Sequence, residues 1–250
     1  MADPGRSVLR RVGNLGSGAA VIVGVWWILA LVVSNRVLPP PHVVFARVFE
    51  LFPNPLLAHA QASLARVLKA VGLATVCALP LGILLGRNRV ADSILSPAAY
   101  LMYPVPKIAL LPIVFLLLGV GEEARVGIVA LVLFFQMLFV VRDAARAVPA
   151  SYVKVLAGLG GRPIHTVRYV VLPAVLPAIL TGLRIGIGTA LAVLFFAETF
   201  FTRYGLGFFI IDSWSKVAYV DMMAGIVALS IVGIALFTIV DLLESVFVRH

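Results

Sequence analysis

Six long apolar stretches recur along the chain, and they limit its possible folds more than any other feature of the sequence. Each is close to the roughly 20 residues that an α-helix needs to cross the hydrocarbon core of a bilayer. Charged residues make up only 12% of the chain, against about 25% in soluble domains. We therefore predict an all-α integral membrane protein with about six transmembrane helices and exclude a soluble globular domain. The stretches occupy residues 18–34, 64–86, 94–119, 126–141, 173–197 and 222–240.

The basic character of the chain, with a formal net charge of +9, raises the alternative of a nucleic-acid partner. The 20 Lys and Arg residues are scattered between the apolar stretches and form no basic run with interleaved aromatic residues, so no nucleic acid is expected. The single cysteine, Cys77, excludes an intrachain disulfide and is expected to fill a small space in the core. The four histidines show no metal-ligand spacing, and no metal site is predicted.

The distribution of positive charge predicts which loops face the cytoplasm. Eleven of the 20 Lys and Arg residues lie in the N-terminal tail, in residues 87–93 and 142–168, and at the C-terminus, whereas the opposite loops hold five. Cytoplasmic loops of membrane proteins retain positive residues, so both termini and the 142–168 loop are expected in the cytoplasm. No small-residue cleavage site follows the first apolar stretch, which indicates an uncleaved helix. We predict a multi-pass protein of the plasma membrane (the bacterial inner membrane), with a cytoplasmic tail over residues 1–17 and a single transmembrane domain over residues 18–249.

Prolines interrupt the third apolar stretch at membrane depth. Pro104, Pro106 and Pro112 would leave backbone carbonyls unpaired in a lipid-facing helix, so this break is expected to line protein or a water-filled path. Two short amphipathic pieces, residues 43–52 and 208–214, are expected to lie as interfacial helices on the outer face.

The motifs of an enzyme are missing from the sequence. None of the four lysines follows a glycine, which excludes the phosphate-binding loop G-x-x-x-x-G-K-[ST]. The glycine pattern that begins at residue 119 follows no strand and predicts a tight turn. The adjacent Glu122 and Glu123 are interpreted as solvated residues of that turn rather than as an acid and base pair. We therefore predict that the chain is not an enzyme.

Residues 149–173 differ from the long apolar stretches, because charged residues and a pair of glycines interrupt them. An apolar pattern at helical spacing over residues 150–159 stops at Gly160 and Gly161, and Pro163 suits the first turn of a second helix. Two short helices that meet at a glycine bend would form a rigid projection for insertion into a partner. The alternative is an ordinary loop that lies on the lipid headgroups.

The same residues resemble the cytoplasmic coupling loop, or EAA loop, of ABC importer permeases. Gly160, Val170 and the pair Leu172-Pro173 match the glycine, aliphatic and Leu-Pro positions of that loop. The resemblance covers about residues 18–249 and is to the nitrate, taurine, sulfonate and bicarbonate branch of these permeases. Beyond the loop it is carried by Leu38-Pro39-Pro40-Pro41, Pro104–Pro112, Leu172–Gly186 and Gly205-Leu206-Gly207.

This resemblance implies a type I ABC importer (MetI-like) permease fold, a second copy of the permease, two cytoplasmic ATPase subunits and an extracytoplasmic solute-binding protein. ATP and Mg would be bound by the ATPase partner, so this chain would hold no cofactor. Where the family places Glu-Ala-Ala, this sequence has Lys154-Val155-Leu156, so the polar contacts of that acidic residue do not carry over. The coupling residues that the resemblance implies are Lys154, Leu156, Gly160, Gly161, Arg162, His165, Arg168, Leu172 and Pro173.

Four cationic residues fall at membrane depth, where charge is expensive and usually faces protein or water, and all four are candidates for an anion path: Arg66, Lys69, Lys107 and Arg184. Lys107 follows the proline break and is a candidate for an anion path. Arg66 and Lys69 share one helical face near the outer end, where extension to the interface is an adequate alternative explanation. Arg184 lies among small residues that allow close helix approach, so a structural ion pair explains it as well as transport does. Glu198, at the outer end of the fifth stretch, is a candidate partner.

The function expected from the resemblance is the translocation path of an ABC importer for a small solute. The cations at depth favour a small anion such as a sulfonate, nitrate or bicarbonate, and a pyrimidine-like or other heteroaromatic nutrient is the alternative. A self-contained secondary transporter would be expected to show inverted repeats and acidic residues at the midplane. A membrane enzyme would place His, Asp or Glu clusters at a span end. Neither pattern is visible in the sequence.

Overall fold

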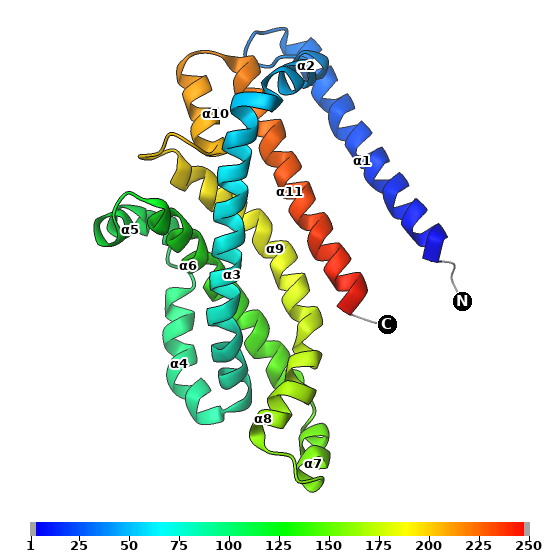
Figure 1. The fold of residues 1–250 in the computed structure, drawn as a ribbon, viewed down its shortest axis with the longest axis vertical. Helices are drawn as coiled ribbons and strands as arrows, with labels where there is room; N and C mark the ends of the chain where they lie inside the picture. The colour runs from blue at the N-terminus through cyan, green and yellow to red at the C-terminus, as the bar shows by residue number, and fades with distance from the viewer. Residues whose placement is uncertain (1–3, 248–250) are drawn as a thin grey trace.

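Three long helices, α3 (Leu57–Arg87), α6 (Glu122–Ala147) and α9 (Leu172–Glu198), pack together at the centre of the structure (Figure 1). The computed structural model describes residues 4–247, and every regular element within them is a helix. The remaining helices are α1 (Pro4–Val33), α2 (Pro41–Leu51), α4 (Arg89–Met102), α5 (Leu111–Leu118), α7 (Ala150–Gly158), α8 (Pro163–Thr166), α10 (Leu206–Ser215) and α11 (Tyr219–Phe247). Short π-helical turns cover Phe52–Leu56 and Val167–Val171, and a 3-10 turn covers Lys107–Leu110.

Within the described residues, five helical segments are long and apolar enough to cross a membrane. The pair formed by α4 and the helical segment Lys107–Leu118 passes the same test but bends by 82° at the break between them, which brings the number of spans to as many as six. The predicted spans therefore correspond to helices, and the third is broken where the prolines predict. The two amphipathic pieces form α2 and α10, which lie together at one end of the molecule (Figure 1).

Small residues let α3 approach α6 closely. An added Cβ at Gly82 would lie 2.7 Å from Val141 Cβ, and one at Gly86 would lie 2.5 Å from the Arg142 carbonyl oxygen. Because lipid tails are as apolar as the helices, burying apolar surface does not drive helices together in a membrane. Close backbone packing of this kind supplies much of the association energy instead. The central helices therefore form a rigid frame for the polar groups between them.

The expectation that Cys77 fills a space in the core is wrong. Its side chain is exposed, because the face of α3 that packs inward is formed by Ala70, Ala74, Ala78 and Gly82 at a spacing of four residues. A membrane span is apolar on all sides, so hydrophobicity alone does not reveal which face packs against protein.

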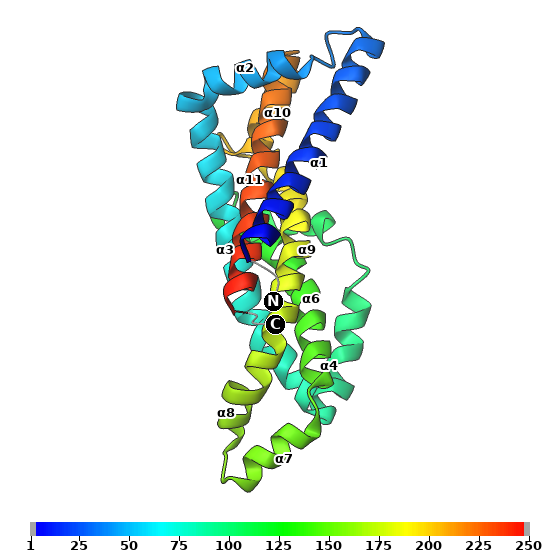
Figure 2. The ribbon, with the colours of Figure 1, turned by 90° about the vertical axis from the view of Figure 1, so that its right-hand side faces the viewer.

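The first helix, α1, lies apart from the other helices at its N-terminal end and beside α2 at its C-terminal end (Figure 1). There Trp26 Nε1 donates to the Pro39 carbonyl oxygen at 3.1 Å, and the Trp27 ring lies 5.1 Å from that of His42. Because α1 begins at Pro4, residues 4–17 of the predicted tail continue this helix. The start of α1 and the end of α11 both lie near the middle of the long axis of the molecule (Figures 1 and 2), and the side of the membrane they face stays a prediction.

Candidate functional site

Arg66 lies at the centre of a buried polar cluster where α3, α6 and α9 approach the end of the molecule that carries α2 and α10. The Arg66 side chain is 3% exposed and that of Glu198 is 1% exposed. Nε of Arg66 donates to Glu122 Oε2 at 2.7 Å, and Nη1 donates to Glu198 Oε1 and to the Tyr204 carbonyl oxygen, each at 2.7 Å. Arg66 therefore does not extend to the membrane interface, because its donors are occupied inside the protein.

Ser63 and the loop before α10 complete this cluster. Ser63 Oγ donates to the Glu198 carboxylate at 2.8 Å and accepts the Leu206 backbone N–H at 2.8 Å, while the Gly207 N–H donates to Glu198 Oε2 at 2.9 Å. Gly205 has φ +131°, which disfavours a side chain, and an added Cβ would lie 2.6 Å from Glu198 Oε1. The two glycines thus let the backbone approach a buried carboxylate.

The interpretation of Glu122 as a residue of a solvated turn needs correction. Glu122 begins α6, and although its side chain is 52% exposed, both carboxylate oxygens accept hydrogen bonds from Arg66. Arg125, one turn further on, is buried and donates to the carbonyl oxygens of Gly121 at 2.8 Å and Phe200 at 3.0 Å. The positive charges of two arginines therefore balance the negative charges of two glutamates in this cluster, which contains Arg66, Arg125, Glu122 and Glu198.

Lys107 closes the break between α4 and α5. Its Nζ donates to the carbonyl oxygens of Met102 at 3.1 Å, Tyr103 at 2.8 Å and Val105 at 3.4 Å, and lies 4.8 Å from the Phe135 ring centroid. A cation at these carbonyls is favoured by the negative end of the α4 dipole. An ammonium has three N–H donors, so all of them are engaged within the chain.

A cavity of about 260 Å³ lies beside this break. Gln136 on its wall donates from Nε2 to Thr189 Oγ1 at 3.3 Å, whereas its Oε1 is buried without a hydrogen-bond partner in the described part of the chain. The cavity is therefore lined mostly by aromatic and aliphatic side chains, with Lys107 and Gln136 as its polar lining residues. Its lining residues are Tyr103, Val105, Lys107, Ile108, Val132, Phe135, Gln136 and Val193.

The two remaining cations predicted at membrane depth differ in their surroundings. Arg184 forms ion pairs with Asp241 and Glu244 of α11, and it does not pair with Glu198. Lys69 is exposed, and its side chain forms no hydrogen bond or ion pair with any residue that the structure describes. Of the four cations, three are therefore engaged within the chain, and the structure does not bring them together in one place.

Residues 149–173 form two short helices joined by a glycine turn. This segment projects beyond the turn between α3 and α4 in both views (Figures 1 and 2). No residue of α7 is buried, and the apolar side chains of Tyr152, Val155, Leu159, Ile164 and Tyr169 along the segment are exposed. Such a projecting apolar surface differs from a loop that merely covers the end of a bundle.

The glycine turn has a defined geometry. Gly160 has φ +78° with open space around it, and its N–H donates to the Ala157 carbonyl oxygen at 3.0 Å. An added Cβ at Gly161 would lie 2.7 Å from the Leu156 carbonyl oxygen. His165 Nδ1 accepts the Arg162 N–H at 3.2 Å, which orders the start of α8. The other implied coupling residues lie outside this turn: Lys154 and Arg168 are exposed, and Leu172 and Pro173 begin α9.

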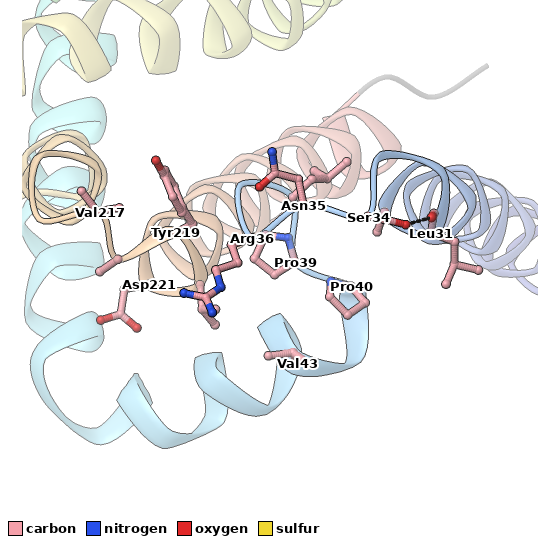
Figure 3. Close-up of a pocket in the computed structure, with 14 residues that line it drawn as sticks. Leu31, Ser34, Asn35, Arg36, Pro39, Pro40, Val43, Val217, Tyr219 and Asp221 are labelled. Carbon is pink, nitrogen blue, oxygen red and sulfur yellow. Dashed lines mark hydrogen bonds between the residues drawn. The ribbon is translucent and has the colours of Figure 1, made fainter.

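At the opposite end, a pocket of about 770 Å³ separates the α1–α2 connection from the start of α11 (Figure 3). Arg47 links α2 to the start of α11, since its Nε donates to Asp221 Oδ1 at 2.7 Å. Arg36 is exposed and lies beside Pro39 in this pocket (Figure 3).

Sequence reasoning missed several polar contacts inside the bundle. Asp92 of α4 accepts from Arg142 Nε at 2.6 Å and from Ser96 Oγ at 2.6 Å, and it also binds Arg146. Their spacing carried a signal: Asp92 and Ser96 are four apart, as Ser63 and Arg66 are three apart, so each pair shares one helical face. Polar residues that repeat on one face of an apolar helix indicate a buried polar contact.

Comparison with known proteins gives consistent matches. The family model described as "Binding-protein-dependent transport system inner membrane component" matches residues 78–250. The chain is 30% identical to the taurine transport system permease protein TauC of Escherichia coli over 92% of this chain and 86% of TauC. It is 28% identical to the nitrate import permease protein NrtB of Synechocystis, again over 92% of this chain and 86% of the relative.

The structural match agrees with these relatives. A chain of the MetNI methionine ABC transporter in an inward-facing conformation superposes with a TM-score of 0.64, over 78% of this chain and 96% of that one. The identity in this match is 20%, so the likeness concerns the fold. The expected type I importer permease fold is confirmed.

Proposed function

Because the chain belongs to the family of binding-protein-dependent transport system inner membrane components, we propose that it forms the translocation path of an ABC importer for a small anion. It is an ABC importer permease of the taurine, sulfonate, nitrate and bicarbonate branch, and it is a multi-pass protein of the inner membrane. As the permease component it is not itself catalytic, and ATP is bound by a partner ATPase. In the proposed arrangement both termini and residues 149–173 lie in the cytoplasm.

The observation that carries the proposal is the shape of residues 149–173. An α7 without a buried residue, followed by a turn at Gly160 with φ +78°, presents apolar side chains away from the bundle. Exposed apolar surface of this kind marks an interaction site in a soluble environment. We assign it the role of inserting into the ATPase partner, with Lys154, Leu156, Arg162, His165 and Arg168 at or near the contact.

The complete machine would contain two copies of this chain, two ATPase subunits and an extracytoplasmic solute-binding protein. Family membership implies the two kinds of partner, and the numbers of copies belong to the proposal. ATP and Mg would be held by the ATPase subunits. The end that carries α2 and α10 would then receive the binding protein.

The substrate class rests on the relatives and on the cations that remain available. TauC and NrtB are named for taurine and nitrate, both small solutes with an anionic group. Within this chain we propose Lys69 and the cavity beside Lys107 for the path, because Lys69 is exposed and the cation Lys107 lines that cavity. Arg66, Glu198 and Arg184 are assigned structural roles through their ion pairs. A heteroaromatic nutrient is the alternative substrate.

Uptake into proteoliposomes tests the function. The permease would be reconstituted with its ATPase and binding-protein partners, and the uptake of labelled taurine and nitrate would be measured with and without ATP. Uptake that needs both ATP and the binding protein is expected. Uptake driven by an ion gradient without ATP would identify a secondary transporter, and uptake of a neutral heteroaromatic compound alone would overturn the anion class.

A further inference from the structure

A basic pocket lies where the C-terminal end of α3, the N-terminal end of α4 and the C-terminal end of α6 meet. Its volume is about 770 Å³, and three arginines from three helices, Arg87, Arg89 and Arg146, line it together with one carboxylate, that of Asp92. The distribution of positive charge places this end of the bundle in the cytoplasm, so the position of the pocket rests on the orientation in the proposed function.

The positive charge of the pocket exceeds its negative charge. Asp92 is already bound by Arg142 at 2.6 Å, in addition to its ion pair with Arg146. Arg87 uses only Nη1, which donates to the Val148 carbonyl oxygen at 3.1 Å and more weakly to that of Ala145. Arg89 is exposed, and its side chain forms no hydrogen bond or ion pair within residues 4–247. Since each guanidinium carries five N–H donors, several remain for an anion.

The helix beside this pocket presents an apolar face. Val90, Ile94, Leu95 and Leu101 of α4 are exposed, and α4 lies at the edge of the bundle in both views (Figures 1 and 2). A basic pocket at the cytoplasmic end of an exposed apolar helix complements a phospholipid. The arginines would bind the phosphate of the headgroup, and the acyl chains would lie along the helix. A soluble anion would use the arginines alone, whereas a phospholipid would contact both the arginines and the apolar face of α4.

The geometry points to this pocket as a binding site for the phosphate headgroup of an anionic phospholipid, with the acyl chains along α4. The pocket is also lined by Pro149 and Ala150, where α7 begins. A headgroup held there would therefore fix the base of residues 149–173. Lipid composition would in this way tune the communication between the permease and the ATPase.

Native mass spectrometry of the permease in detergent tests the binding itself, and it needs neither ATP nor a substrate. The probes are phosphatidylglycerol, phosphatidylcholine and inorganic phosphate. We compare the wild type with the double variant Arg87→Gln/Arg89→Gln, and Arg36→Gln serves as the matched control because Arg36 lies in the pocket at the opposite end. The variants must elute and melt as the wild type does, and Arg89→Gln alone replaces the double variant if that one fails to fold.

Retention of phosphatidylglycerol that phosphate does not displace is expected, with the double variant binding about tenfold or more weakly and the control unchanged. Equal retention by the wild type and the double variant would overturn the site. Full displacement of the lipid by inorganic phosphate would assign the pocket to a free anion instead.

A second measurement separates this inference from the proposed function. The ATPase activity of the assembled complex is compared in nanodiscs of phosphatidylcholine with and without phosphatidylglycerol. Stimulation by phosphatidylglycerol that the double variant loses supports the lipid site. If the double variant fails to retain the ATPase subunits in either lipid, the pocket is an ATPase contact and the lipid assignment is wrong. If the complex transports nothing but the permease still retains lipid at the arginines, only the proposed function fails.

Discussion

The guanidinium of Arg66 and the carboxylate of Glu198 meet in the interior, with 2.7 Å between Nη1 and Oε1, although 132 residues separate them in the chain. The pair joins α3 to α9, and the bond from the Gly207 N–H to Glu198 ties the start of α10 to it. Both side chains are almost completely buried, so neither charge has water as a substitute partner. In the proposed function, the pair would stabilise the face of the permease to which the binding protein docks.

Replacing Glu198 with Gln keeps the shape of the side chain and removes its charge. Arg66 would keep Glu122 but lose its buried partner, so we expect the stability to fall by about 3 kcal/mol, as for other broken buried ion pairs. Thermal unfolding of the purified protein in detergent measures this. The control is Glu50→Gln, since Glu50 is 63% exposed in its pair with Arg47, and its stability should change by no more than about 0.5 kcal/mol. Equal melting temperatures for the two variants would contradict the role of the pair.

Gly205 and Gly72 offer a second matched comparison. At Gly205 an added Cβ meets the Glu198 carboxylate and φ is +131°, whereas at Gly72 no atom lies within 4 Å and the residue is inside α3. We expect Gly205→Ala to destabilise the protein by about 2 kcal/mol, through strain and displacement of the carboxylate. Gly72→Ala should be neutral or stabilise the protein by up to about 1 kcal/mol. The same thermal measurement distinguishes the two, and a neutral Gly205→Ala would show that the loop is free to move.

The order and number of the spans were predictable from the sequence because hydrophobicity and length determine which segments cross a bilayer. The break in the third span was also predictable, since Pro104 and Pro106 cannot continue a helix. The partners of the buried charges were not. Glu122 follows a turn in the sequence, and only the packing of α3 against α6 brings Arg66 to it. Ion pairs over long sequence separations have no local signature, and Arg184 with Asp241 and Glu244 is a second example.

The glycine turn at residues 160–161 could be predicted because a left-handed residue after a short helix is a local property of the chain. Its function could not be obtained in the same way. The sequence here has Lys154-Val155-Leu156, and the exposed side chain of Lys154 forms no hydrogen bond or ion pair with the residues that the structure describes. The function of the α7 surface depends on the second protein that it contacts.

Replacing Lys107 with Gln should lower the uptake of an anionic substrate while leaving assembly intact. The ammonium holds the carbonyl oxygens of Met102 and Tyr103 at the break and forms one wall of the 260 Å³ cavity. A neutral amide would bind these carbonyl oxygens less strongly and would remove the positive charge that lines the cavity. We expect uptake to fall about tenfold. The control is Lys216→Gln, because Lys216 is an exposed residue paired with Asp212 of α10. Unchanged uptake in Lys107→Gln would leave this lysine a purely structural role.

Replacing Gly160 with Glu should uncouple transport from ATP hydrolysis. Gly160 has φ +78°, a conformation that costs other residues roughly 1–2 kcal/mol, so the chain would relieve the strain by tilting α7 relative to α8. No atom lies within 4 Å of the added Cβ, so the effect would arise from the backbone and from the new side chain at the partner surface, not from a clash inside the permease. A misfit of about 3 kcal/mol at such a contact corresponds to more than 10²-fold in affinity. The measurement is the ATPase activity of the reconstituted complex with and without loaded binding protein, beside the membrane expression of the variant.

Two further variants separate the backbone from the charge at this turn. Gly160→Asn should retain most of the stimulated activity, because Asn adopts the left-handed conformation more readily than other residues with a side chain. Gly158→Glu adds the same acidic side chain two residues earlier, at an exposed position of α7 with an ordinary helical backbone and no atom within 4 Å. If Gly160→Glu loses stimulation while Gly160→Asn and Gly158→Glu keep it, the conformation of the turn carries the coupling. If Gly158→Glu loses it equally, the surface charge of α7 decides the contact. Full stimulated activity in Gly160→Glu would mean that residues 149–173 do not couple this permease to its ATPase.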